Sequence, residues 1–277
     1  MSPKNKIMLI VCLIGIFASL ISVHCLAENQ SGSAQATPAA LKIAIYFVSD
    51  STCSYYEPQR FPRTGWGQVF PKFLKAGSGI AVNNTAKSGR STRSFITEGW
   101  WDKIKASLKP GDYVLIQMGH NDQDSAAGST RATTPDQYRQ YLGQYVDETR
   151  AAGAIPVLLT PVERWHFNAN GVFATSHAPS YTDNVKALAA EKMVPFIDLQ
   201  QQSRELLVGL GASEAEKLFM TFGPEAWPQN YPNGSSDHTH FTYEGALQIA
   251  KLVAQGIQEK IPRLAPYIDL NGAAEIR

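Results

Sequence analysis

Cysteine, net charge and repeated segments are all scarce in this sequence. Its 277 residues include 3 cysteines, and the formal net charge is +1. We see no basic stripe, so the composition gives no support for nucleic-acid binding. Apolar residues make up 44% and charged residues 18% of the chain, which fits a packed globular protein rather than a disordered one. No repeat or linker follows residue 40, so we expect one folded domain over residues 41–277.

A long apolar run lies near the N-terminus, directly after two lysines. It covers Ile7–Val23, and the small side chains of Cys25 and Ala27 follow it at the spacing of a cleavage site. The pattern predicts a secretory signal peptide over residues 1–27, and therefore a secreted or periplasmic protein without a membrane anchor after cleavage. The alternative is an uncleaved anchor. Residues 28–40 are small and polar, which is typical of a flexible leader.

Cleavage after residue 27 would leave Cys53 as the single cysteine of the mature chain. An intramolecular disulfide is then excluded. Cys53 is interpreted either as a small buried residue or as a nucleophile, because it lies two residues past Ser51.

Short apolar runs alternate with segments of helical periodicity along the rest of the chain. Strands are expected at residues 43–48, 80–82, 113–118, 155–159 and 195–199. Helices are expected at residues 65–74, 135–152, 181–193, 200–210 and 241–261. The alternation predicts an α/β fold with a parallel sheet and right-handed crossovers. Residues 163–179 and 222–236 are less regular and are expected to form binding loops.

The stretch Ile43–Thr52 changes from a buried strand to a polar turn. Ligands of open α/β sheets bind beyond the carboxyl ends of the strands, so Ser51 is a candidate nucleophile. The alternative is that Ser49, Asp50, Ser51 and Thr52 cap a following helix. That helix start would also direct the N–H of Ser51 at a reacting group.

A serine nucleophile needs a base and a third group that orients the base. Asp237 and His240 are three residues apart, so one tight turn can join the carboxylate to the imidazole and leave the other ring nitrogen for Ser51. Gly89 can present a bare backbone N–H and Asn121 a side-chain amide. Together with the N–H of Ser51, they are the candidate donors for an oxyanion hole.

Four sequence blocks, in this order, resemble the SGNH hydrolase superfamily of GDSL-type esterases. They are Ser49–Thr52, Lys87–Ser91, Gly119–Asp122 and Asp237–His240, with Ser49 in place of the usual glycine. The combination is most similar to the rhamnogalacturonan acetylesterases, over roughly residues 41–261. The resemblance implies a flavodoxin-like three-layer α/β/α sandwich with a five-stranded parallel sheet. It also implies Ser51 as nucleophile, His240 as base and Asp237 as its orienting partner, with oxyanion donors at Ser51, Gly89 and Asn121.

The activity that this resemblance implies is removal of O-acetyl groups from pectic polysaccharide, without a metal or organic cofactor. The expected partner is an acetylated polysaccharide or oligosaccharide, and the protein is expected to be a monomer. Three alternatives stay open at this stage. They are a GDSL-type esterase or thioesterase for lipid or small esters, a deacetylase of another polysaccharide such as xylan, and a glycan-binding protein without activity.

The same histidines permit a metal hypothesis. In a strand, Asp237, His238 and His240 could act as metal ligands, and Asn121 with Asp122 could belong to a metallophosphatase pair. The order His120–Asn121 is the reverse of the usual metallophosphatase order, so we expect no metal, and we expect His120 and His238 to orient their neighbours.

Candidate substrate-binding residues lie in the two irregular segments. Arg164 could pair with a uronate carboxylate, and the rings of Trp165 and Trp227 could stack on sugars. The alternative is that these aromatic side chains pack beneath their own loops.

Overall fold

The structure, a computed structural model, describes residues 40–272. The expected signal peptide lies outside the described residues, as does the expected leader apart from Ala40. None of the helices in the described range is both long enough and apolar enough to cross a membrane.

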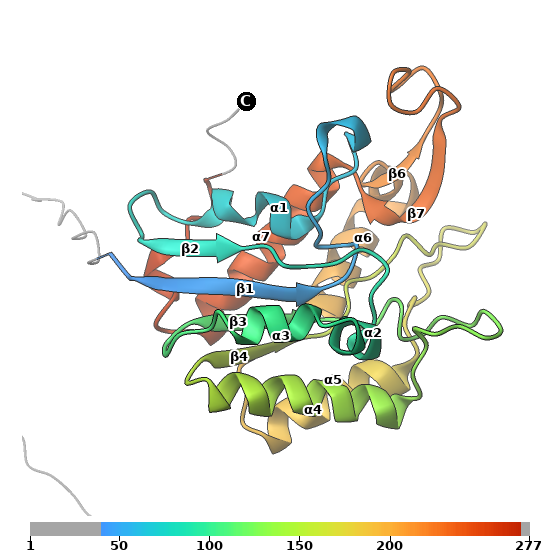
Figure 1. The fold of residues 1–277 in the computed structure, drawn as a ribbon. Helices are drawn as coiled ribbons and strands as arrows, with labels where there is room; N and C mark the ends of the chain where they lie inside the picture. The colour runs from blue at the N-terminus through green and yellow to red at the C-terminus, as the bar shows by residue number, and fades with distance from the viewer. Residues whose placement is uncertain (1–39, 273–277) are drawn as a thin grey trace, which may run out of the picture. The chain divides into compact units, whose positions relative to one another are not determined.

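A parallel sheet forms the middle layer of the fold (Figure 1). In spatial order its strands are β2 (Ile80–Asn83), β1 (Ile43–Ser49), β3 (Tyr113–Gln117), β4 (Ile155–Leu159) and β5 (Phe196–Ile197). Every neighbouring pair is parallel. This is the flavodoxin-like strand order, so the expected five-stranded sheet is confirmed.

Helices cover both faces of the sheet. Successive side chains of a strand point to opposite faces, and because both sets are apolar here, each face has to be buried under helices. Ile45 and Phe47 of β1 contribute to one hydrophobic core, while Tyr46 and Val48 contribute to the other. The first core packs against α1 (Trp66–Val69), α6 (Leu199–Glu216) and α7 (Tyr243–Lys260). The second packs against α2 (Thr92–Thr97), α3 (Trp100–Lys105), α4 (Pro135–Ala151) and α5 (Pro179–Glu191). The expected three-layer α/β/α arrangement is therefore confirmed.

Several expected boundaries were wrong for local reasons. The helix expected at residues 65–74 is the short α1 followed by a 3₁₀ turn, Phe70–Phe73, because Pro71 has no N–H to continue an α-helix. The helix expected at 200–210 extends through α6 and bends at Gly211, where φ is +75°. Two further 3₁₀ turns occupy Pro58–Arg60 and Ala265–Tyr267.

A second, two-stranded sheet was not expected. It pairs β6 (Phe219–Phe222) antiparallel with β7 (Ser235–Phe241), and it replaces part of the segment 222–236 that we expected to be irregular. The short helix α3 was also not expected. In Figure 1, β6 and β7 project beyond the end of the central sheet toward which β1 points. This position brings the polar sequence of β7 to the carboxyl ends of the parallel strands.

Candidate active site

Ser51 lies in a buried turn directly after β1. Residues 51–53 form this turn, closed by the N–H of Cys53 on the carbonyl of Asp50 at 3.3 Å, and the first α-helix begins only at Trp66. The expectation that Ser51 starts or caps a helix was therefore wrong. The turn keeps Ser51 7% exposed at the end of the strand.

Ser51, His240 and Asp237 form one chain of hydrogen bonds. His240 Nε2 lies 2.8 Å from Ser51 Oγ, and His240 Nδ1 lies 2.7 Å from Asp237 Oδ2. Ionised Asp237 can only accept, so Nδ1 carries a proton in the neutral ring and Nε2 is free to accept from the Ser51 hydroxyl. The arrangement is that of a nucleophile, a general base and an orienting carboxylate.

An irregularity in β7 creates this geometry. Phe219 of β6 pairs with Phe241, while the next residue, Met220, pairs with Asp237. Residues 238–240 therefore pair with no residue of β6 and form a bulge of three residues. The bulge turns the side chains of Asp237 and His240 toward each other. Asp237 Oδ1 stabilises the bulge by accepting from the N–H groups of Thr239 and His240, at 2.9 and 3.1 Å.

The same contacts set the charge of Asp237. Burial alone would raise the pKa of its carboxyl. However, the hydrogen bond and charge of His240, together with two backbone N–H groups, hold that pKa well below its usual range. Asp237 is thus ionised at neutral pH and orients the imidazole.

A second carboxylate–imidazole pair lies beneath Ser51. Asp50 is fully buried, and its Oδ2 lies 3.3 Å from Nδ1 of His120. Its Oδ1 accepts from the N–H and hydroxyl of Thr52, at 2.9 and 2.8 Å. Burial favours a higher pKa for Asp50, but His120 and Thr52 outweigh it and lower the pKa. The pair fixes the turn that carries Ser51.

The three expected oxyanion donors come from neighbouring loops. The N–H of Lys87 donates to the carbonyl of Ser49 at 2.9 Å, which attaches the Gly89 turn to the end of β1. Asn121 follows β3, and its amide donates to the carbonyl of Arg90 at 2.9 Å. Within residues 40–272, the N–H groups of Ser51 and Gly89 donate to no protein acceptor. Gly89 has φ +78°, a conformation that glycine adopts without strain.

Arg164 and Trp165 lie on the loop after β4. Nη2 of Arg164 is 3.4 Å from the carbonyl of His120, and its Nε is buried without a hydrogen-bond partner in the described residues. Burial lowers the pKa of Arg164. The Trp165 indole donates to the carbonyl of Ala212 at 2.8 Å, and its ring packs on His238. Trp165 thus packs against α6 and β7, and Arg164 keeps an unused donor in the described residues.

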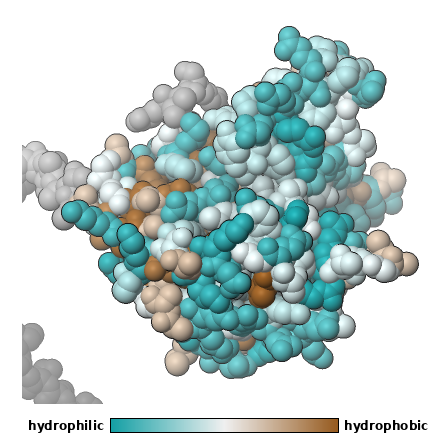
Figure 2. Space-filling view, viewed as in Figure 1, coloured by the Kyte–Doolittle hydropathy of each residue, from teal (hydrophilic) through white to brown (hydrophobic). Residues whose placement is uncertain are grey.

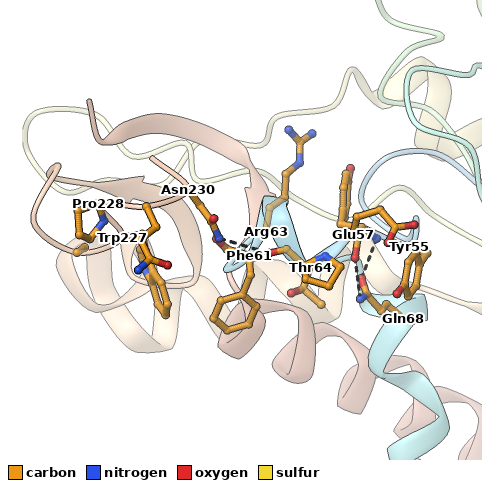
Figure 3. Close-up of a pocket in the computed structure, with 13 residues that line it drawn as sticks. Tyr55, Glu57, Phe61, Arg63, Thr64, Gln68, Trp227, Pro228 and Asn230 are labelled. Carbon is orange, nitrogen blue, oxygen red and sulfur yellow. Dashed lines mark hydrogen bonds between the residues drawn. The ribbon is translucent and has the colours of Figure 1, made fainter. Parts of the chain in front are cut away.

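Trp227 lies elsewhere, on the segment between β6 and β7. It is 37% exposed and lines a pocket with residues that follow Ser51 in sequence (Figure 3). Tyr56 and Arg63 also line this pocket, and sequence reasoning missed both. No motif marks them, because their place depends on contacts between segments far apart in the chain.

The two histidines of β7 do not converge. His238 Nε2 contacts Glu216 Oε1 at 3.0 Å, whereas both ring nitrogens of His240 are engaged with Asp237 and Ser51. The described residues contain no group of three or more metal-ligating side chains. The arrangement resembles a serine-hydrolase triad more than a shared metal site.

Cys53 and Asp122 support the site from below. Cys53 is fully buried against α1, and burial raises the pKa of its thiol, which fits its interpretation as a small core residue. Asp122 accepts from the N–H of Thr92 and from the hydroxyls of Thr92 and Thr133. It thereby joins the Asn121 turn to the start of α2.

Comparisons with known proteins agree with this geometry. Residues 50–247 match the model of the GDSL-like Lipase/Acylhydrolase family. The rhamnogalacturonan acetylesterase RhgT of Bacillus subtilis (strain 168) is 42% identical over 218 residues, which are 78% of this chain and 90% of that protein. The probable rhamnogalacturonan acetylesterase YesY of the same organism is 39% identical, over 78% of this chain and 92% of that protein. The crystal structure of Bacillus subtilis YxiM matches with a TM-score of 0.66 and 26% identity over 79% of this chain, which spans 57% of that solved chain.

Proposed function

Since the chain belongs to the GDSL-like lipase/acylhydrolase family, we propose that it is a serine esterase that removes O-acetyl groups from rhamnogalacturonan. The hydrogen-bonded chain of Ser51, His240 and Asp237 carries the chemical part of this proposal. The relatives RhgT and YesY, whose names include rhamnogalacturonan acetylesterase, support the substrate.

The proposed reaction has two halves. Ser51 Oγ attacks the acetyl carbonyl while Nε2 of His240 takes its proton, and the N–H groups of Ser51 and Gly89 and the amide of Asn121 stabilise the oxyanion. His240 then returns the proton to the leaving sugar hydroxyl, which leaves an acetyl group on Ser51. In the second half, a water molecule deprotonated by His240 attacks the acetyl carbonyl, and the bond to Ser51 Oγ breaks as His240 returns the proton to Oγ, which releases acetate and restores the enzyme. This scheme requires no metal and no organic cofactor.

The surface around the site favours a carbohydrate over a lipid. On the face that Figure 2 shows, the surface over β6 and β7 is hydrophilic to neutral, and the most hydrophobic region lies at the opposite end of the sheet, near the start of β1. A lipase needs a broad apolar surface beside the nucleophile, whereas a sugar polymer needs polar groups with a few aromatic faces. Arg164, Trp165 and Trp227 are the substrate-binding residues of this proposal.

The proposal includes secretion or export to the periplasm, as a monomer free of the membrane after signal cleavage. Its support is the signal-like sequence of residues 1–27. Mass spectrometry of the exported protein, which should begin at Glu28, tests this part.

Acetate release from acetylated rhamnogalacturonan tests the activity, with acetylated xylan and acetylated homogalacturonan alongside. We expect release from rhamnogalacturonan, and loss of release in Ser51→Ala with the fold intact. Equal release of acetate from xylan would support the proposed chemistry but refute rhamnogalacturonan as the specific substrate. Normal turnover by Ser51→Ala would refute the mechanism.

A further inference from the structure

A cavity of about 610 Å³ lies between the segment that follows Ser51 and the segment between β6 and β7, and the proposed reaction does not use it. Two segments form its walls, one after β1 and one between β6 and β7 (Figure 3). The lining residues used below are Tyr55, Tyr56, Phe61, Arg63 and Trp227.

The first wall, the segment after β1, is hydrogen-bonded to the backbone at Ser51 and next to His240. The Tyr56 hydroxyl donates to the carbonyl of Ser51 at 2.8 Å. The N–H of Thr64 donates to the carbonyl of Phe241, the residue after His240, at 3.0 Å. Two lining residues, Tyr56 and Thr64, are therefore hydrogen-bonded to the backbone that carries Ser51 and His240, although neither catalytic side chain lines the cavity itself.

The second wall is fixed to the first by contacts between distant parts of the sequence. The Asn230 amide donates to the carbonyl of Phe61 at 2.7 Å, and the Tyr231 hydroxyl donates to the carbonyl of Arg60 at 2.8 Å. The rings of Phe61 and Trp227 meet edge to face, with centroids 4.9 Å apart. The cavity is thus formed before any ligand binds, which lowers the ordering cost of binding.

Exposed aromatic rings surround this cavity. Tyr55 is 58%, Phe61 38% and Trp227 37% exposed, although rings of this size usually gain stability by burial. Concave sites with aromatic walls and few polar groups are typical of ligand pockets. Pyranose rings present apolar C–H faces that such walls can contact.

Arg63 is the cation of this cavity. Its guanidinium carbon lies 4.7 Å from the centre of the Tyr56 ring, and its Nε is buried without a hydrogen-bond partner among residues 40–272. No carboxylate within residues 40–272 forms an ion pair with Arg63. This includes Glu57, which lines the same pocket but is exposed. A guanidinium packed near an aromatic ring, with an Nε–H group that has no acceptor in the described residues, is suited to a carboxylate.

We propose that this cavity is a subsite for a uronic-acid unit of an acidic polysaccharide, and that Arg63 binds its carboxylate. Phe61 and Trp227, whose rings extend to the other side of the segment from the Arg63 guanidinium, contact further sugars of the same polymer chain (Figure 3). The inference rests on the proposed deacetylation and extends it, because it makes the charge of the polymer a determinant of specificity. Arg164 lies on a different loop, so the two arginines are independent contacts.

Arg63→Ala tests the subsite, with Arg60→Ala as the matched control. Arg60 belongs to the same segment and carries the same charge, but it is exposed and does not line the cavity. We expect Arg63→Ala to lower kcat/KM for acetylated rhamnogalacturonan oligosaccharides on the order of 10- to 100-fold more than kcat/KM for 4-nitrophenyl acetate, mainly through KM. Arg63→Lys should recover only part of this loss, because lysine lacks the fork.

Arg60→Ala should leave the ratio of the two kcat/KM values as in the wild type. An equal fall of the ratio in both variants would reveal an effect of net charge and overturn the subsite. An unchanged ratio in Arg63→Ala would overturn it as well.

A binding measurement separates this inference from the proposed function. In the Ser51→Ala background, calorimetry with deacetylated rhamnogalacturonan oligosaccharides should show binding that Arg63→Ala weakens on the order of 10-fold or more. The same oligosaccharides with their carboxyl groups reduced to alcohols should bind weakly to both proteins. Equal affinity for the acidic and the reduced forms would overturn the role of Arg63. A wild-type protein that releases no acetate would refute the proposed function, while the binding result would still decide the subsite.

Discussion

Replacing Asp237 with asparagine should remove most esterase activity while the fold stays in place. The carbonyl oxygen of the new amide can occupy the position of Oδ1 and keep the hydrogen bonds from the N–H groups of Thr239 and His240. The new NH₂ group then faces Nδ1 of His240, where Oδ2 accepted a hydrogen bond at 2.7 Å. Two donors cannot share this contact, so the imidazole changes tautomer and Nε2 carries the proton. Nε2 can then no longer accept the proton of Ser51.

The expected loss follows from this change of tautomer. In the Ser-His-Asp triad that serves as the general example, the same substitution lowers kcat on the order of 10⁴-fold. We expect a loss of about 10³- to 10⁴-fold here, equivalent to about 4 to 5.5 kcal/mol in the barrier. The fold should lose only on the order of 1 kcal/mol at neutral pH, because partly exposed Asp237 is screened by solvent.

Initial rates with 4-nitrophenyl acetate measure the effect, and urea unfolding followed by circular dichroism checks the fold. Glu216→Gln is the matched control, because Glu216 makes the other carboxylate–imidazole contact of β7, to His238 at 3.0 Å. This control should retain activity within about threefold, since its histidine does not touch Ser51. A folded Asp237→Asn that keeps more than about a tenth of the wild-type rate would refute the assignment of Asp237.

Two further predictions concern stability. Burial raises the pKa of Asp122 to about 6 from its ordinary 3.8, so the folded protein holds this proton more tightly than the unfolded chain does. The resulting gain in unfolding free energy is fully present below pH 3.8 and is lost as the pH rises through about 6. Relative to Asp122→Asn, the wild type should therefore gain about 1 kcal/mol in unfolding free energy between about pH 7.5 and about pH 5, and a constant difference would contradict this. Buried His177, whose pKa is lowered, acts in the opposite direction but is common to both proteins. In Gly245→Ala, the new Cβ would lie 2.0 Å from a backbone carbonyl oxygen, so urea unfolding should show a loss above about 2 kcal/mol. Gly209→Ala, with nothing within 4 Å, should change stability by less than about 1 kcal/mol, and equal losses in the two variants would refute the steric argument.

The central sheet and the site at its edge were predictable because their signals are local. Apolar runs marked all five parallel strands, and the polar residues at the ends of β1 and β3 marked Ser51 and Asn121. In contrast, β7 has the polar sequence SSDHTHF, without apolar alternation, and it forms a strand only because β6 pairs with it. Its bulge is a property of that pairing. Spacing alone could therefore suggest the contact of Asp237 with His240, but not the strand that presents it.

Short local structure was harder to predict for a related reason. The helix α2 has six residues and begins with a capping box between Ser91 and Ser94, a pattern too brief to show helical periodicity. Ser51 shows the opposite case, because its polar turn resembles a helix cap, yet residues 54–57 directly after the turn are not helical. Both outcomes depend on the surrounding packing, such as the buried Asp50–His120 pair under Ser51.

The residues that recognise the substrate are harder to predict from local sequence than the catalytic residues are. Arg60 and Arg63 lie three residues apart and are indistinguishable as sequence signals. The fold separates them, since Arg60 is exposed, whereas Arg63 packs near the Tyr56 ring and its Nε has no hydrogen-bond partner in the part of the chain that the structure describes. The segment between β6 and β7 completes the cavity, and β7 also carries His240. One small sheet therefore supports both the base and a wall of the cavity, so a change in this segment can alter which polymer fits while the triad geometry is kept.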